Sequence, residues 1–186
     1  MKRVLPAVFI LILAAAAVPV QGSSISAGIG FSTFNYGEIY LATHAAFHIT
    51  LARGMELNFG FDFALWPVRE GVAQPRFYLP VYGGVDFFFG NTNPIFFVGV
   101  GVNPVFILYP EPDPAYNETG LRFFMGPSLR GGIRLRVHEF MSWFVYLQQD
   151  LLIGPPGWIN TATSVKTGIN FQLSPVRRTR PLGGTS

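Results

Sequence analysis

The chain has 186 residues, which is enough for one domain and short for two. Charged residues make up only 12% of it and hydrophobic residues 49%, whereas soluble domains carry about 25% charged residues on average. Five of the 13 basic residues lie at the two ends, so the body has 8 basic against 10 acidic residues and gives no reason to expect nucleic-acid binding. The absence of cysteine excludes disulfides, thiolate metal sites and a cysteine nucleophile.

The N-terminus has the pattern of a secretory signal peptide. Lys2 and Arg3 precede an apolar run from Val4 to Val18, and small residues around Gly22 suit signal peptidase. We predict a leader over residues 1–22 that is cleaved after Gly22. An uncleaved membrane anchor is the less favoured alternative, because the apolar run is shorter than the roughly 20 residues of a spanning helix.

After this leader the chain alternates between apolar residues and polar or small ones with a period of two, the period of a β-strand. In the segment 55–65, for example, Leu57 and Phe59 share one face while Glu56 and Asn58 share the other. Seven further segments repeat the pattern, over residues 24–32, 41–51, 76–87, 96–103, 121–135, 142–151 and 164–173. Eight such segments match the smallest usual transmembrane barrel, whose tilted strands need about ten residues each.

The connections alternate in length, as expected for short periplasmic turns and longer external loops. The joints near 53–54, 90–93 and 137–139 are short, those near 66–75 and 109–120 are longer and contain proline, and those near 33–38 and 154–157 are modest. Pro104 predicts a bulge or an early end of the fifth strand. Aromatic residues near the strand ends predict girdles at the membrane interfaces: Tyr36, Tyr40, Trp66, Tyr109 and Trp158.

A soluble β-sandwich is the alternative, because its strands alternate too. A sandwich fills its polar face with residues such as Lys, Glu and Thr, whereas here that face holds mainly Gly, Ser, Ala and a few charges of both signs. Small residues suit the narrow interior of a closed barrel. The sequence therefore predicts an all-β fold, an eight-stranded antiparallel up-and-down transmembrane β-barrel.

The last predicted strand resembles the C-terminal assembly signal of outer-membrane barrels. Lys166, Gly168, Phe171 and Leu173 match its polar residue, its glycine and its two alternating hydrophobic residues. That signal usually ends near a terminal aromatic residue, whereas this chain continues, and we predict residues 174–186 to be a disordered basic periplasmic tail. Residues 23–173 as a whole resemble the small eight-stranded bacterial outer-membrane proteins, of which the OmpW, OmpX and OmpA-barrel groups are examples.

The resemblance implies a bacterial outer-membrane location and contact with outer-membrane lipid and the barrel-assembly machinery. It implies a structural or porin-like role, with passage of small hydrophobic solutes or binding of an external ligand through the surface loops. The alternatives are an adhesin or host-interaction barrel and a lipid A-modifying outer-membrane enzyme. We expect no enzyme activity, because no serine with a histidine partner stands out on the lipid side.

The predicted inward faces carry charges of both signs. The expected lumen network consists of Glu56, Asp62, Asp86, Asp150, Arg122, Arg130, Arg134 and Lys166. Because an unpaired buried charge is costly and eight strands leave room only for side chains, we expect these groups to pair and plug the lumen. A conducting or gated pathway is the alternative.

His44 and His48 share the inward face of the second segment. Four residues along a strand span about 13 Å, too far for one metal ion to join them, so we predict hydrogen-bonded lumen residues and no metal or cofactor. The third external loop carries residues suited to binding an external ligand: Glu111, Asp113, Tyr116 and Glu118. A solvated acidic loop is the plainer interpretation.

Overall fold

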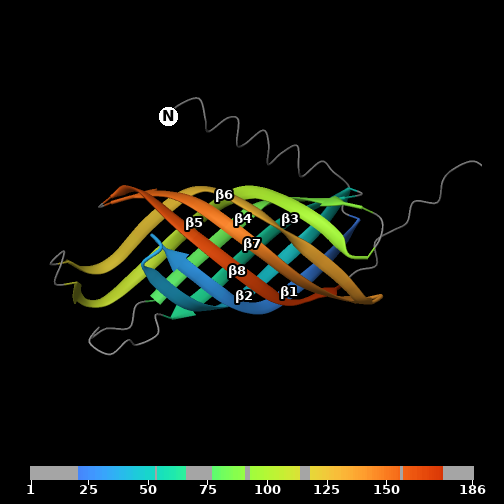
Figure 1. Ribbon diagram of the computed structural model, residues 1–186, viewed down its shortest axis with the longest axis horizontal. Helices are drawn as coiled ribbons and strands as arrows, with labels where there is room; N and C mark the ends of the chain where they lie inside the picture. The colour runs from blue at the N-terminus through green and yellow to red at the C-terminus, as the bar shows by residue number, and fades with distance from the viewer. Residues whose placement is uncertain are drawn as a thin grey trace, which may run out of the picture.

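The structure is a computed structural model that describes residues 21–52, 54–65, 77–90, 93–113, 118–155 and 157–173. The predicted leader, apart from residues 21 and 22, and the predicted tail lie outside these residues. Strands follow one another along the chain: β1 (Gly22–Phe34), β2 (Glu38–Ala52), β3 (Met55–Leu65), β4 (Phe77–Phe89), β5 (Ile95–Asp113), β6 (Glu118–His138), β7 (Met141–Gly154) and β8 (Trp158–Gln172). Their tilt is visible in Figure 1.

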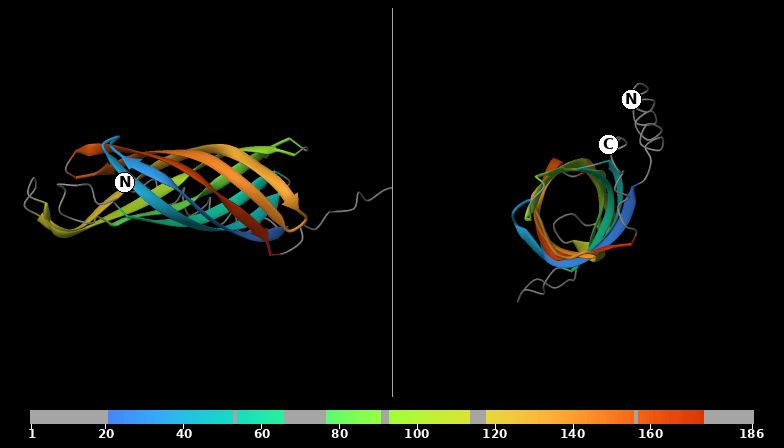
Figure 2. Two further views of the ribbon diagram at one scale, coloured as in Figure 1. Left: turned by 60° about the horizontal axis from the view of Figure 1, so that its bottom comes forward. Right: turned by 90° about the vertical axis from the view of Figure 1, so that its right-hand side faces the viewer.

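The strands form one closed antiparallel barrel in the order β1 to β8. Each strand pairs with the next, and β8 returns to β1 over a register that runs from Ser24↔Gln172 to Phe34↔Ala162. The end-on view in Figure 2 shows the resulting ring. The predicted fold class is thereby confirmed. Among the described residues, no helix is long and apolar enough to cross a membrane.

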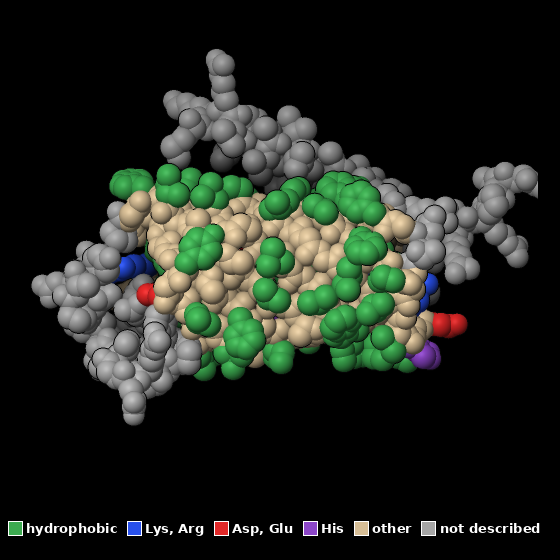
Figure 3. Space-filling model, in the orientation of Figure 1, with side chains coloured by type: hydrophobic (Ala, Val, Ile, Leu, Met, Phe, Trp, Pro, Cys, Tyr) green, Lys and Arg blue, Asp and Glu red, His purple; other side chains and the backbone are tan. Residues whose placement is uncertain are grey.

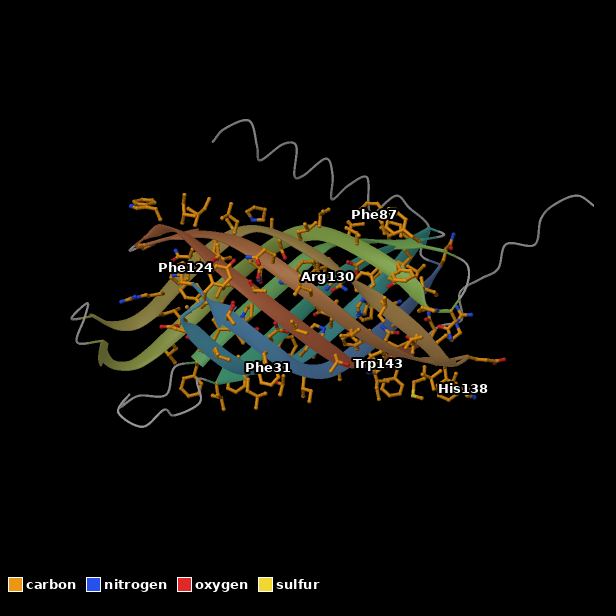
Figure 4. All side chains as sticks on the ribbon, viewed as in Figure 1. Phe31, Phe87, Phe124, Arg130, His138 and Trp143 are labelled. Atoms are coloured by element: carbon orange, nitrogen blue, oxygen red, sulfur yellow. The ribbon has the colours of Figure 1, made fainter. Side chains whose placement is uncertain are left out.

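The wall turns its apolar face outward. Large hydrophobic side chains on the outer surface remain about half exposed, among them Phe31 at 60%, Phe61 at 55% and Leu129 at 55%. Figure 3 shows apolar side chains spread along the wall and charged ones confined to the two ends, and Figure 4 places Phe31, Phe87 and Trp143 outside the barrel and Arg130 inside it. An apolar exterior around a polar interior is stable only where lipid covers the wall.

The two ends of the barrel differ. We call the end where β1 starts and β8 ends the inner end, and the end where β1 ends and β8 starts the outer end. The predicted long loop over 109–120 was wrong, because β5 and β6 continue as a paired hairpin to Asp113↔Glu118. Figure 1 shows this hairpin extending past the neighbouring strands.

Pro104 does not end β5, so that prediction was wrong. The β5–β6 ladder runs straight through Pro104↔Met125, and only the pairs of residues 103 and 104 with β4 are missing. The ladder with β4 resumes in the same register, since a proline lacks the backbone donor on one side of the strand only. Pro80 and Pro127 coincide with similar two-pair gaps toward β3 and β7.

The second strand contains one irregularity near its inner end. The register with β3 shifts between Thr50 and Ala52, and Leu51, predicted to face outward, is buried at 5% exposure. A bulge reverses the side on which the next residue lies, which explains the difference.

Restoring a backbone donor at Pro104 tests the account of the interrupted ladder. Pro104→Val keeps an apolar outward side chain and supplies an N–H opposite β4. We expect the free energy of unfolding in lipid vesicles to rise by about 1 kcal/mol, the typical contribution of one hydrogen bond. Urea titration provides the measurement, with Pro155→Val in an exposed turn as the control. A Pro104→Val protein less stable than the wild type would contradict the account.

Candidate functional site

The candidate site is the lumen, where the inward faces of all eight strands meet. Alternation along each strand brings its polar residues inward, and nearly every predicted lumen residue is buried there. Arg122 is partly buried near the outer end and Arg134 is partly buried toward the inner end. Ion pairs join residues that are far apart in the sequence, because the two partners of each pair lie on strands that are not adjacent in the ring.

Asp86 on β4 and Arg130 on β6 form the central ion pair. The Arg130 Nε atom donates to Asp86 Oδ1 at 2.8 Å and its terminal nitrogen donates to Oδ2, so the contact is bidentate. The guanidinium also lies 4.3 Å from the centre of the Tyr82 ring. Gly99 makes this possible, since a Cβ at that position would collide with the Asp86 carboxylate and approach the Arg130 stem.

Two further pairs flank this centre. Arg134 donates to both oxygens of Glu56, at 3.1 and 3.0 Å, and lies over the Phe88 ring. Lys166, the polar residue of the predicted assembly signal, pairs with Asp62 inside the barrel and is only 2% exposed. With the central pair, these ion pairs give three of the four acidic lumen residues a cationic partner.

The two histidines lie in this polar network. His44 Nδ1 is 2.7 Å from Asp62 Oδ1, and its other ring nitrogen is 3.4 Å from the Tyr146 hydroxyl. His48 Nδ1 is 2.8 Å from the Asn58 amide nitrogen, and His48 Nε2 is 2.9 Å from Ser26 Oγ. In the described part of the chain, no three His, Cys, Asp or Glu side chains are grouped to hold a metal ion.

Ser26, His48 and Asn58 have the connectivity of a nucleophile, a base and its orienting group, which the sequence analysis did not foresee. The protonation pattern, however, is the opposite of what catalysis requires. Because the Asn58 amide nitrogen donates to His48 Nδ1, the neutral ring carries its proton on Nε2 and donates to Ser26. A base in that tautomer cannot take the serine proton.

Asp150 on β7 has a different environment. It accepts hydrogen bonds from the amides of Asn103, at 2.6 Å, and Gln148, at 3.0 and 3.2 Å, and it has no ion pair. Ser128 lies directly opposite it on β6.

An apolar cluster closes the lumen toward the outer end. We name it the outer apolar layer, and it consists of Phe34, Tyr40, Ala42, Ala64, Tyr78, Val105, Ile107, Phe124, Leu152 and Ala162. Tyr40 is fully buried and stacks on Tyr78 with ring centres 4.8 Å apart, so its predicted place in an interface girdle was wrong. Tyr36 and Trp158 are exposed, as a girdle requires, whereas the side chains of Trp66 and Tyr109 lie outside the described residues.

A second aromatic cluster, Phe97, Phe144 and Tyr146 with Phe88 packed against it, lies among the ion pairs, where the cations of Arg130, Arg134 and Lys166 contact its rings. Between these groups the lumen retains a cavity of about 10 Å³, lined by residues that include Ser26, His48, Asp86 and Arg130. A cavity of that size holds one water molecule at most. This cavity therefore has no room for a solute larger than water.

The remaining residues singled out in the sequence lie outside the lumen network. In the predicted assembly signal, Gly168 faces Gly28 across the β1–β8 pair, Phe171 points outward, and Leu173 follows β8. Glu111, Asp113 and Glu118 belong to the ends of β5 and β6, with side chains outside the described set, and Tyr116 falls outside the described residues. Their roles stay predictions.

Known structures share this architecture at very low sequence identity. Neisserial surface protein A matches with a TM-score of 0.62 and 6% identity over 80% of this chain and 94% of its own. Ail, the attachment invasion locus protein of Yersinia pestis, matches at 0.59 and 13% over 82% and 99%. The N-terminal β-barrel domain of Pseudomonas aeruginosa OprF matches at 0.52 and 13% over 82% and 100%.

Comparison by sequence finds no match, in contrast to comparison by structure. No protein-family profile matches the chain, and no curated protein matches it. The likeness in fold confirms the resemblance to small eight-stranded bacterial outer-membrane barrels. Membership of the OmpW, OmpX or OmpA-barrel group stays a prediction.

The central ion pair can be tested by a double-mutant cycle. Arg130→Leu leaves the Asp86 carboxylate buried without its cation, and we expect the free energy of unfolding to fall by about 3–5 kcal/mol. Asp86→Leu combined with Arg130→Leu should recover much of that loss, because no charge remains to be buried. Urea titration in vesicles measures both, and Arg136→Leu at the exposed inner end is the control. A double variant no more stable than Arg130→Leu would refute the pairing energetics.

Proposed function

We propose that this protein is an integral protein of the bacterial outer membrane that acts as a closed anchor for the hairpins at its outer end. The observation that carries the proposal is the filled lumen. Three ion pairs and the outer apolar layer occupy the interior, and the cavity left among them is about 10 Å³. Export through a cleaved signal peptide and assembly by the barrel-assembly machinery belong to the same proposal.

The outer end supplies the surface for binding. The β5–β6 hairpin is built from strands of 19 and 21 residues, longer than the other strands, and its tip carries the acidic residues singled out in the sequence. Loops and hairpins on a rigid scaffold are where binding residues concentrate. The names of two similar structures, a surface protein and an attachment protein, support a role at the cell surface.

Two other roles have less support. A porin-like passage would need an open lumen, and a small hydrophobic solute would have to cross the outer apolar layer. A lipid A-modifying enzyme would need a reachable nucleophile, whereas Ser26 and His48 are buried at 5% and 6% exposure. Mass spectrometry of lipid A from cells with and without the gene would reveal such an enzyme as a mass difference.

Electrical recording tests the closed lumen. We expect planar bilayers containing the refolded wild type to stay silent, because ions cannot cross a dry, side-chain-filled interior. Arg130→Ala and Asp62→Ala variants serve as comparisons that remove lumen charges. Discrete wild-type conductance steps that these substitutions alter would establish a pore and contradict the proposal.

Shortening the β5–β6 hairpin tests the binding role. Replacing residues 110–119 by Asn-Gly joins Tyr109 to Gly120 through a two-residue turn and leaves the barrel wall intact. We expect bacteria that display this variant to lose most of their adherence to cultured epithelial cells, with Glu139→Gln at the inner end as the control. Both variants must keep the heat-dependent gel shift of a folded barrel. Unchanged adherence would count against the proposed role.

A further inference from the structure

Asp150 is a buried carboxylate whose charge lacks a close partner. It is 1% exposed, and the neighbouring lumen cations are engaged elsewhere, Lys166 with Asp62 and Arg130 with Asp86. Two amide donors lower the cost of burying this charge, but neutral donors do not cancel it. The interior around Asp150 therefore has an excess of negative charge.

The same place has an excess of oxygen atoms without donors. Asn103 Oδ1 and Gln148 Oε1 are buried and accept no hydrogen bond, and each side chain is 1% exposed. Ser128 is buried as well, and its hydroxyl lies within reach of the Asp150 carboxylate, to which it can donate. Buried polar atoms normally have a partner, so two orphan oxygens beside a carboxylate without an ion pair indicate a missing group.

These oxygens lie within reach of a single ion. Because the Asn103 and Gln148 amide nitrogens touch the carboxylate, their oxygens lie no farther than about 5 to 5.5 Å from it, given the width of an amide. A half-turn of either amide exchanges its oxygen and nitrogen without needing space. Ser128 faces Asp150 across the β6–β7 pair. Ligand oxygens on opposite sides of a hard cation are likewise about 5 Å apart.

The donor set selects the kind of ion. All of the candidate ligands are oxygens, which suit hard cations and not zinc or copper. A single carboxylate supplies one negative charge, which matches a monovalent cation, whereas tight divalent sites use several carboxylates. Leu152 of the outer apolar layer lies two residues beyond Asp150 toward the outer end, so an ion bound here would be sealed from the outside.

We propose that the lumen holds one sodium ion, bound by the Asp150 carboxylate with oxygens of Asn103, Gln148 and Ser128. The ion would enter during folding and remain trapped beneath the outer apolar layer. It would be the counter-charge of Asp150, the acidic lumen residue that the three ion pairs leave out.

The test is to refold the wild type into vesicles in sodium chloride traced with radioactive sodium, or in choline chloride at the same ionic strength. After exchange into choline chloride, we expect about one sodium ion retained per folded chain, and a higher urea midpoint for the protein folded with sodium. Asp150→Asn should retain none and show the same midpoint in both salts. Glu56→Gln, whose carboxylate has Arg134, should lower stability and still retain sodium.

Two results would overturn the proposal. Wild-type protein that retains no sodium and has equal midpoints in both salts lacks the site, and this comparison needs no variant to fold. Equal retention by Asp150→Asn would place the ion elsewhere. Stability that ignores sodium and rises on acidification would show a proton in its place, which also refutes the sodium site. None of these results depends on whether the outer hairpins bind a partner.

Discussion

A backbone N–H or C=O group inside a lipid bilayer has no water to bind, so it must find its partner within the protein. In this chain the pairing of β8 with β1 meets that demand, because it removes the last open edge of the sheet. The remaining features follow from it. Once the ring is closed, every second side chain must face a narrow interior, and the others must face lipid. Even Pro80, Pro104 and Pro127 are compatible with this constraint, since each costs pairing on one side of its strand and leaves the register unchanged.

Closure also determines how the interior is built. A charge that faces inward cannot reach bulk water, and so it is stabilised by an opposite charge on another strand. Arg130 reaches Asp86 because Gly99, on the strand between them, has no side chain to block the contact. The interior thus contains ion pairs packed among aromatic rings, with an apolar layer toward the outer end, which is the arrangement of a protein core and not of a channel. A barrel of this kind is stabilised by the packing of its interior, and its two ends are the surfaces that lipid does not cover.

Alternation in the sequence was sufficient to predict the strands and which side of the wall most of their side chains face, because successive residues of a strand in a closed sheet point alternately inward and outward. It failed where a residue's environment depends on position along the barrel axis. Tyr40 and Phe124 are apolar yet face inward, and nothing in the local pattern distinguishes a lumen layer from an interface girdle. The sequence predicts a loop at the β5–β6 hairpin because Pro110 and Pro112 suggest turns, whereas both lie in β5 at an irregularity of the register between Tyr109 and Asp113, where no cross-strand pair needs their missing donors. The inward charges were foreseen as a set, but their partners depend on the register, which no single segment specifies.

The pairing of Lys166 with Asp62 links closure of the ring to the drying of its interior. Asp62 is 104 residues earlier in the chain, and Lys166 lies in β8, one of the two strands whose pairing closes the sheet. While the ring is open, the Asp62 carboxylate lacks this cation, and water must solvate it in place of Lys166. Closing the ring and removing water from this part of the lumen are therefore coupled. An open form of the barrel differs from the closed one in the solvation of its charges as well as in its unpaired edges.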